Sequence, residues 1–486
     1  MKRRWSPGAT AEAHAVKRQR TLHSIRRRFD LTSALADELW LLIFSFMDAQ
    51  DLCHVEAVSK GFRRVATDNE LWKELFLRTF GRLRGGRSQF TFTKRPLVSL
   101  PAHLHTTSVS SAVDWKSLYI IGNNWRRGRS VIRQLELAPK DGTPKPLVLF
   151  LGQQGLVLTS GDLSFSPSIA VSSSDTEMHL FSGGQIIVPI RISSLSLNQL
   201  GQSVGDAHSS ILLAAFYSTD TKLHHLSIFE ISTGIHSSRE VHIMSPRTPR
   251  RPITCSAFHS NLLLSLSEGF QLDIYLTPTG KPSDMMLMRT LTSYSSFLPS
   301  SLTLSRPSTS LHRILLSYTV PLYPAHWSVA CTQFQLDSRG ETVDSKTLRV
   351  FPYGWKDILD DTEDDFPLQG GRFLNISAVQ SDGKWMVVVP QAETFVELYR
   401  LRTNSISFVR VLSGPTAPIC AVAIADGRVV AVALDGSIWI YDLERSWTIE
   451  LRNKALGAEL DATRICFDER RIAITTPSHV QVISFD

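Results

Sequence analysis

The sequence predicts a mixed fold: a small α-helical module, a helical hinge, and a long, mostly antiparallel all-β region built from repeats. Two periodicities carry this prediction. Apolar side chains of residues 31–80 recur every three or four positions, as on one face of a helix, whereas from residue 147 onward they alternate with a period of two. Composition agrees, because 486 residues allow about two to four domains and a hydrophobic fraction of 43% suffices for a sizeable core.

The net charge of +7 belongs to the first thirty residues. Residues 1–30 contain nine basic and two acidic side chains, whereas the remaining 456 contain 43 of each sign, so nucleic acid is not the expected partner of the rest of the chain. Two basic clusters on a flexible spacer predict nuclear import through an importin. The alternative is a solvated arm that touches nucleic acid or acidic proteins without specificity. The residues expected to carry the import signal are Lys2, Arg3, Arg4, Lys17, Arg18 and Arg20.

The expected compartment is the nucleus, with the cytoplasm as a second location. Five cysteines are scattered singly, which describes neither a disulfide framework nor a paired-cysteine metal site and indicates a reducing compartment. The longest nearly unbroken apolar stretch, residues 39–47, is far shorter than the ~20 residues that span a bilayer, so no membrane is expected. Nuclear accumulation that persists in a fluorescent fusion lacking residues 1–20 would refute the import signal.

Residues 31–80 predict three short helices. Ser33 can cap the first of them, and Asp37 lies in its first turn, at the positive end of the helix dipole. Residues 48–51 interrupt the apolar stripe, and Asp68 can cap the third helix. Three such helices enclose only a small core, so the module would gain from packing its surplus apolar surface on a partner.

Residues 35–76 resemble an F-box almost end to end. The resemblance rests on Leu35, Glu38-Leu39, Ile43, Met47-Asp48, Asp51-Leu52, Val58-Ser59, Phe62-Arg63 and Leu71-Trp72-Lys73. The sequence departs from the family at Ala36, where proline is usual, and at Phe62, where tryptophan is commoner. Loss of the proline would weaken partner binding somewhat, since proline pre-sets φ in the first turn.

The F-box resemblance implies that this module docks on the Skp-type adaptor of a cullin–RING ubiquitin ligase. The alternative is that the same apolar stripe is only the core of a domain cap. The residues expected to bind the adaptor are Leu35, Leu39, Ile43, Phe44, Leu52 and Val58.

Two segments separate the module from the β region. Residues 81–113 have no sustained period and predict a loop or a partly disordered linker. Residues 114–130 predict a helical hinge and resemble the connector of F-box/WD-repeat proteins, which implies a stiff link. That resemblance rests on Trp115, Leu118-Tyr119, Asn124-Trp125-Arg126 and Gly128.

Residues 147–486 contain seven strand-rich copies, one per about 49 residues, and propeller blades are roughly 40–50 residues long. The clearest copy, residues 418–446, resembles a WD repeat, with Tyr441-Asp442 where Trp-Asp is usual and two Asp-Gly pairs suited to tight hairpins. The other copies, which are more degenerate, are residues 163–184, 211–234, 253–280, 314–340, 376–403 and 462–485.

These copies predict an antiparallel β-propeller, with seven blades as the expected number. The strand at residues 147–152 is expected to complete the last blade and close the ring, which leaves no free edge. Two or three β-sandwich domains are the rival, because they also give strands at short intervals.

The sequence contains no motif of a hydrolase, a nucleotide-binding loop or a metalloprotease, and we expect no catalytic residue, metal or cofactor. The acidic run within residues 357–365 reads as a solvated loop or as an acidic surface for a basic partner. Ser245 and Thr248, each before a proline, could form a phosphorylation switch, the alternative being a plain polar loop.

The expected function is therefore that of a non-catalytic substrate receptor of an SCF-type ubiquitin ligase, with an F-box for the adaptor and a propeller for the protein substrate. A nuclear F-box/propeller scaffold that works outside a ligase is the alternative, and a propeller hydrolase would need carboxylates that converge in its mouth. Substrate-binding residues cannot be assigned from sequence, because every blade contributes loops to a propeller's binding face.

Overall fold

The computed structural model divides the chain into two compact units, which are described separately. The first contains residues 35–79 and 114–119, and the second contains Phe80 and the residues from Ile120 to Asp486. The described residues are 35–80, 114–136, 147–151, 155–159, 169–173, 176–179, 190–198, 210–219, 224–232, 237–244, 251–277, 281–308, 311–322, 326–350, 375–451, 464–476 and 479–486.

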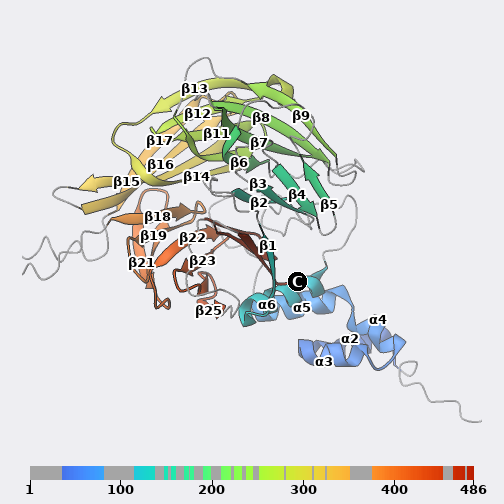
Figure 1. The fold of residues 1–486 in the computed structure, drawn as a ribbon. Coiled ribbons are helices and arrows are strands. Elements are labelled where there is room, and N and C mark those ends of the chain that lie inside the picture. Colours follow the sequence, from blue (N-terminus) through green and yellow to red (C-terminus); the bar gives the residue numbers. More distant parts are fainter. Residues whose placement is uncertain are drawn as a thin grey trace, which may run out of the picture. The chain divides into compact units, whose positions relative to one another are not determined.

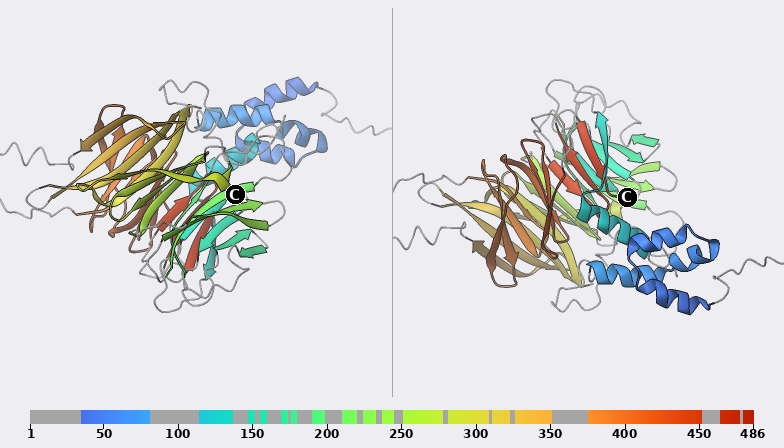
Figure 2. Two further views of the ribbon diagram at one scale, coloured as in Figure 1. Left: turned by 90° about the horizontal axis from the view of Figure 1, so that it is seen from above. Right: turned by 90° about the horizontal axis from the view of Figure 1, so that it is seen from below.

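The described residues 35–80 of the helical module, drawn in blue in Figures 1 and 2, form four helices where the sequence predicted three. The extra break falls at Ser59, whose hydroxyl accepts a hydrogen bond from the Phe62 N–H at 3.1 Å and so starts a new helix. The expected cap Ser33 lies outside the described residues, and Ala36 occupies the N-cap position with no side-chain hydrogen bond. The helices are α2 (Asp37–Ser45), α3 (Ala49–Glu56), α4 (Lys60–Ala66) and α5 (Asn69–Phe80).

A further helix, α6 (Trp115–Arg127), lies within the segment predicted as a hinge. Its residues up to Tyr119 belong to the helical unit, and those from Ile120 onward belong to the β unit. None of the helices within the described ranges is long and apolar enough to cross a membrane.

The β unit consists of four-stranded antiparallel sheets, and the described residues form seven of them (Figure 1). Six sheets have strands in chain order, namely β2–β5, β6–β9, β10–β13, β14–β17, β18–β21 and β22–β25, and the seventh has the order β26-β27-β28-β1. The strands of the first half are β1 (Val131–Glu136), β2 (Leu147–Leu151), β3 (Gly155–Thr159), β4 (Ile169–Ser173), β5 (Thr176–His179), β6 (Ile190–Leu197), β7 (Ser210–Thr219), β8 (His224–Ser232), β9 (Ser237–Met244), β10 (Ile253–His259), β11 (Leu262–Ser267), β12 (Gln271–Leu276) and β13 (Met286–Thr292), which follows the 3₁₀ turn η3 (Pro282–Asp284).

The remaining strands are β14 (Phe297–Ser308), β15 (Leu311–Leu322), β16 (His326–Asp337), β17 (Thr342–Val350), β18 (Ile376–Ser381), β19 (Trp385–Pro390), β20 (Val396–Leu401), β21 (Ile406–Leu412), β22 (Ile419–Ala425), β23 (Arg428–Ala433), β24 (Ile438–Asp442), β25 (Trp447–Leu451), β26 (Arg464–Phe467), β27 (Arg471–Thr475) and β28 (His479–Ser484). Each predicted copy overlaps a different sheet.

The sheets form a closed ring, which confirms the propeller class and excludes separate β-sandwiches. The first strand of each sheet contacts the first strand of the next, in the order β2, β6, β10, β14, β18, β22 and β26, and β26 contacts β2 again. A closed ring of this kind protects every sheet face except at the outermost strands.

The prediction that the strand at residues 147–152 completes the last blade and closes the ring was wrong. The segment at residues 147–152 supplies β2, the first strand of its own sheet, and β1 instead pairs with β28, from Val131 opposite Ser484 to Glu136 opposite His479. The reason is position in the sheet: β2 is almost entirely apolar and suits an inner strand, whereas β1 contains Arg133 and Glu136, which an outer strand tolerates.

The predicted WD-like copy forms two tight hairpins at its Asp-Gly pairs. Asp426 and Gly427 both have positive φ, at 46° and 70°, as a type I′ turn requires, and Gly436 has a φ of 80° in the second Asp-Gly turn. Asp442 is fully buried, and its carboxylate accepts hydrogen bonds from the backbone N–H groups of Glu444 and Arg445. The carboxylate thereby fixes the turn that follows β24.

Candidate functional site

An exposed apolar stripe runs along α2 of the helical module. Leu39, Leu42, Ile43 and Phe46 are spaced by three or four positions around this helix, and Phe46 is its C-cap. Their exposed fractions run from 41% for Ile43 to 80% for Phe46, and Leu35, four residues before Leu39, is 39% exposed. An apolar stripe that is left in solvent marks an interaction surface more often than a packing error.

The structure places four of the six predicted adaptor-binding residues at the surface of the module. Leu35, Leu39 and Ile43 belong to the exposed stripe, and Val58, in the break between α3 and α4, is 68% exposed. These four side chains are available to a partner without any rearrangement of the module.

The other two predicted residues, Phe44 and Leu52, are each only 1% exposed. Phe44 follows Ile43 by one residue, which turns it about 100° around the helix and away from the stripe. Both side chains belong to the core of the module, so they hold the face in place and do not form it.

Leu42 and Phe46 are the most exposed side chains of the stripe, yet they were not among the residues predicted to bind the adaptor. Leu42 is 57% exposed and Phe46 is 80% exposed, the highest exposure on the stripe. Their spacing from Leu39, three and seven residues, was the signal that could have identified them.

The core beneath the stripe is built around Trp72, which is fully buried. Its indole N–H donates to the carbonyl of Ala66 at 2.8 Å, so the ring is fixed in orientation as well as packed. Phe44, Leu52, Val65, Leu71 and Leu75 complete the same buried cluster, against which Trp40, Leu41 and Phe62 also pack. With this core filled, the apolar side chains of the stripe have no further place inside the module.

The first turn of α2 is fastened to α4 by a charge pair. One carboxylate oxygen of Asp37 accepts a hydrogen bond from Arg64 at 2.7 Å, and the other lies 2.6 Å from the same guanidinium. That hydrogen bond lowers the pKa of Asp37. The pair supplies a tether at the point where the family resemblance expects a proline.

The first half of α6 completes the helical module. Trp115 packs edge-on against Phe76, with ring centroids 5.5 Å apart, and Tyr119 packs against Trp72 in the same manner at 5.6 Å. Lys116 forms an ion pair with Glu56 at 2.6 Å. The aromatic residues of the predicted hinge are therefore core residues of this unit.

The second half of α6 belongs to the propeller. Trp125 is fully buried, stacks on Phe485 at 3.9 Å between ring centroids, and donates its indole N–H to the carbonyl of Glu469 at 2.7 Å. Asn124 donates to the carbonyl of Phe485 at 2.9 Å. Gly128 ends the helix with a φ of +64° in a position where a Cβ would lie 2.9 Å from Ile449. The predicted Asn-Trp-Arg-x-Gly pattern therefore has a packing explanation within this unit.

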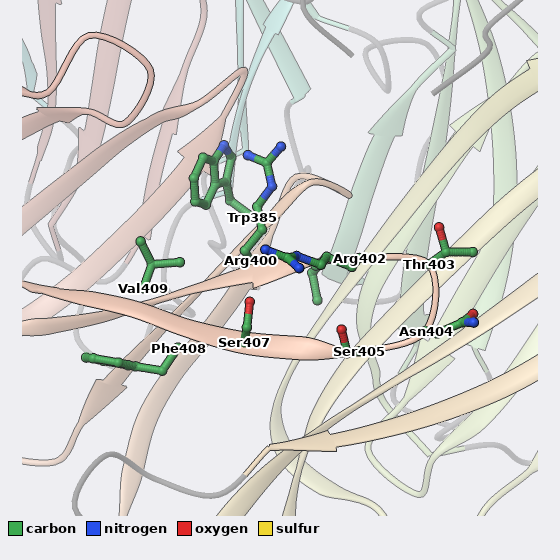
Figure 3. A pocket seen from close by; sticks show the side chains of 10 residues that line it. Trp385, Arg400, Arg402, Thr403, Asn404, Ser405, Ser407, Phe408 and Val409 are labelled. Atoms are coloured by element: carbon green, nitrogen blue, oxygen red, sulfur yellow. The ribbon is translucent and has the colours of Figure 1, made fainter. Parts of the chain in front are cut away.

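The propeller also has an open pocket, which lies on the sheet β18–β21 and has a volume of about 960 Å³ (Figure 3). It is lined by Trp385, Arg400, Leu401, Arg402, Thr403, Asn404, Ser405, Ser407, Phe408 and Val409. Sequence reasoning assigned no binding residue to the propeller, and no motif distinguishes these positions.

Several sequence predictions cannot be placed. The import residues Lys2, Arg3, Arg4, Lys17, Arg18 and Arg20 lie outside the described residues, as do the linker at 81–113, the acidic run at 357–365, Ser245 and Thr248. Within the described part of the chain, no group of three or more His, Cys, Asp or Glu side chains could hold a metal ion.

In a comparison with known families, residues 35–78 match the F-box-like family. The matched range covers α2 to α4 and most of α5, and therefore includes the exposed stripe and its core. The chain combines an F-box-like module with a β-propeller, the composition of an F-box/propeller protein. F-box domains bind Skp-type adaptors, so an adaptor of this kind is the partner that the module suggests.

Proposed function

We propose that this protein is the substrate-recognition subunit of an SCF-type ubiquitin ligase. The helical module binds the Skp-type adaptor, and through it the cullin–RING assembly, while the propeller binds the protein substrate. The receptor itself makes and breaks no bond; its contribution is to hold a substrate lysine near the ubiquitin carrier, since proximity replaces a bimolecular encounter.

The observation that carries the proposal is the exposed stripe on a module whose core is already filled. The proposed adaptor surface differs from the one expected from sequence, since it gains Leu42 and Phe46 and loses Phe44 and Leu52. Burial of apolar area at roughly 25 cal/mol per Å² would make such a stripe the main source of adaptor affinity. The residues of the proposed surface are Leu35, Leu39, Leu42, Ile43, Phe46 and Val58.

Recovery of the adaptor and cullin with the tagged full-length chain tests the proposal. The double variant Leu39→Asp/Ile43→Asp should lose adaptor and cullin together, because it places two charges on the stripe. Leu434→Asp is the matched control, since Leu434 is 43% exposed but lies in the propeller, and it should recover both partners at the wild-type level.

Three outcomes would change the conclusion. Wild-type protein that recovers neither adaptor nor cullin contradicts the proposal. Adaptor without cullin favours a scaffold that works outside a ligase. Equal recovery with the Asp double variant would show that the stripe is not the contact surface.

A further inference from the structure

The pocket on the sheet β18–β21 is formed by three neighbouring strands and by the turn between β20 and β21. Trp385 of β19 lies opposite Arg400 of β20, and Arg400 lies opposite Ser407 of the outer strand β21. Figure 3 shows the Arg400 side chain beside the Trp385 indole, with Ser407 on the strand below them and Ser405 just before that strand. The row places an aromatic ring, a guanidinium and a hydroxyl side by side.

The Arg400 guanidinium lies over the Trp385 ring, with its central carbon 4.2 Å from the ring centroid. Such stacking leaves the edge of the guanidinium, with its N–H donors, directed away from the ring. Among the described residues, Arg400 has no hydrogen bond or ion pair, and burial lowers its pKa. An anion at that edge would offset the cost of burying the charge.

Arg402 adds a second cation to the pocket. Its side chain is exposed and has no hydrogen bond or ion pair within the part of the chain that the structure describes. The turn between β20 and β21 is held by a hydrogen bond from Lys346 of β17 to Asn404. Arg402 therefore projects from an anchored turn.

The nearest acidic groups are already engaged elsewhere. Asp382 accepts hydrogen bonds from the backbone N–H groups of Lys384, Trp385 and Gly427. Glu444 forms an ion pair with Lys384 at 2.5 Å. Both carboxylates attract Arg400 at longer range, but neither lines the pocket.

The strand beside the pocket is suited to an extended ligand. In the sheet order, β21 is the outer strand, so one side of its backbone has no partner strand within this sheet. Such an edge can pair with an extended peptide, and side-chain pockets on the sheet then provide specificity. A nucleic acid backbone would need a longer row of cations than these two arginines.

We propose that this pocket binds an anionic side chain, a carboxylate or a phosphorylated hydroxyl, of an extended protein segment that lies along β21. The inference rests on the proposed function, because it assigns to the substrate an acidic or phosphorylated segment. Arg400 and Arg402 would bind the anion, and Thr403, Ser405 and Ser407 offer hydroxyl groups for further hydrogen bonds.

Fluorescence anisotropy with the full-length chain tests this site. Three labelled peptides share one extended Thr/Val sequence and carry, at alternate positions, glutamate, phosphoserine or glutamine. We expect the glutamate peptide, the phosphoserine peptide or both to bind, and the glutamine peptide to bind at least about tenfold more weakly. The two anionic peptides separate a carboxylate ligand from a phosphorylated one.

Matched variants separate the pocket from general electrostatics. Arg402→Gln should weaken binding of the anionic peptide by roughly tenfold, and Arg400→Lys should also weaken it, since lysine keeps the charge but loses the planar fork. Arg339→Gln changes an exposed arginine in the turn between β16 and β17 that does not line the pocket, and this variant should bind as the wild type does.

Two results would overturn the site: neither anionic peptide binds the wild type, or Arg339→Gln weakens binding as much as Arg402→Gln does. Adaptor recovery is measured on the same variants. Because Arg402 lies outside the helical module, normal adaptor recovery by Arg402→Gln keeps a failure of the pocket distinct from a failure of the proposed function.

Discussion

Helix α2 and strand β23 are both strongly apolar, yet the structure treats them in opposite ways. All six residues of β23 are buried, whereas Phe44 is the only buried residue of α2. The strand lies between two neighbours in its sheet, and the sheet lies between two others, so both faces are covered. The helix packs only one side on the small core of its module. Equal hydrophobicity therefore produces a self-contained core in one unit and a surface for a partner in the other.

The largest expected effect comes from a pair of substitutions on α2 that compares a core residue with a surface residue. Phe44→Ala should cost the helical module about 3–5 kcal/mol of unfolding free energy, because it leaves a cavity in the core. Phe46→Ala should change stability by less than about 0.5 kcal/mol, since that ring is exposed, but should weaken adaptor binding. Urea unfolding followed by far-ultraviolet circular dichroism, with adaptor affinity measured in parallel, gives both quantities. Equal destabilisation by the two variants would contradict an exposed stripe.

Burial in the propeller also makes the protonation of a histidine unfavourable, so the stability of the propeller should decrease at acidic pH. His312 is 1% exposed, and burial, with Arg306 and His259 nearby, lowers its pKa to about 4. The unfolded chain, with a histidine pKa near 6.5, binds protons more readily, so stability should fall as the pH drops from about 6.5 to about 4. Between pH 7 and pH 5, the loss attributable to His312 should be about 2 kcal/mol.

Urea unfolding of the wild type and of His312→Leu at pH 7 and pH 5 measures this dependence. The propeller of the variant should lose less stability between the two pH values than the wild-type propeller does, and identical losses would remove His312 as the cause. The helical module lacks a buried histidine among its described residues, so its transition serves as an internal reference.

The smallest expected effect concerns the start of α2. Ala36 has a φ of −65° and no side-chain cap, which is the backbone geometry that proline imposes. Ala36→Pro should therefore stabilise the helical module by about 0.4–1 kcal/mol, mainly by restricting the unfolded chain. The propeller transition should not move. A lower melting temperature of the module would show that the turn needs an N–H or a φ that proline cannot supply.

The periodicities of the sequence were sufficient to predict the fold class, but not to identify the strand that completes the propeller ring. The three-to-four residue spacing around Leu39 and the alternation after residue 147 correspond to helices and strands as predicted. The break at Ser59 was missed because a three-residue helix gap barely disturbs an apolar pattern. The role of β1 was missed because its partner β28 is more than 340 residues away, and no local pattern encodes such a pairing.

The candidate site, too, could be predicted from the sequence only in part. Periodicity identifies a stripe that contains Leu39, Ile43 and Phe46, but it does not say which side faces the core. Carry-over from the family resemblance placed Phe44 and Leu52 at the surface, and only their packing on Trp72 and its neighbours shows them to be interior. The pocket at Arg400 has no sequence signal, because it depends on the register of three strands.

By itself, the sequence determined the order of the parts: a basic tail, an F-box-like helical module, a hinge, and a repeat-built β region. These follow from local spacing and charge, which neighbouring residues fix. The tertiary structure alone decided which apolar side chains remain in solvent and which strand closes the ring. Those outcomes depend on contacts between residues far apart in the chain, and burial is a property of the neighbours that surround a residue.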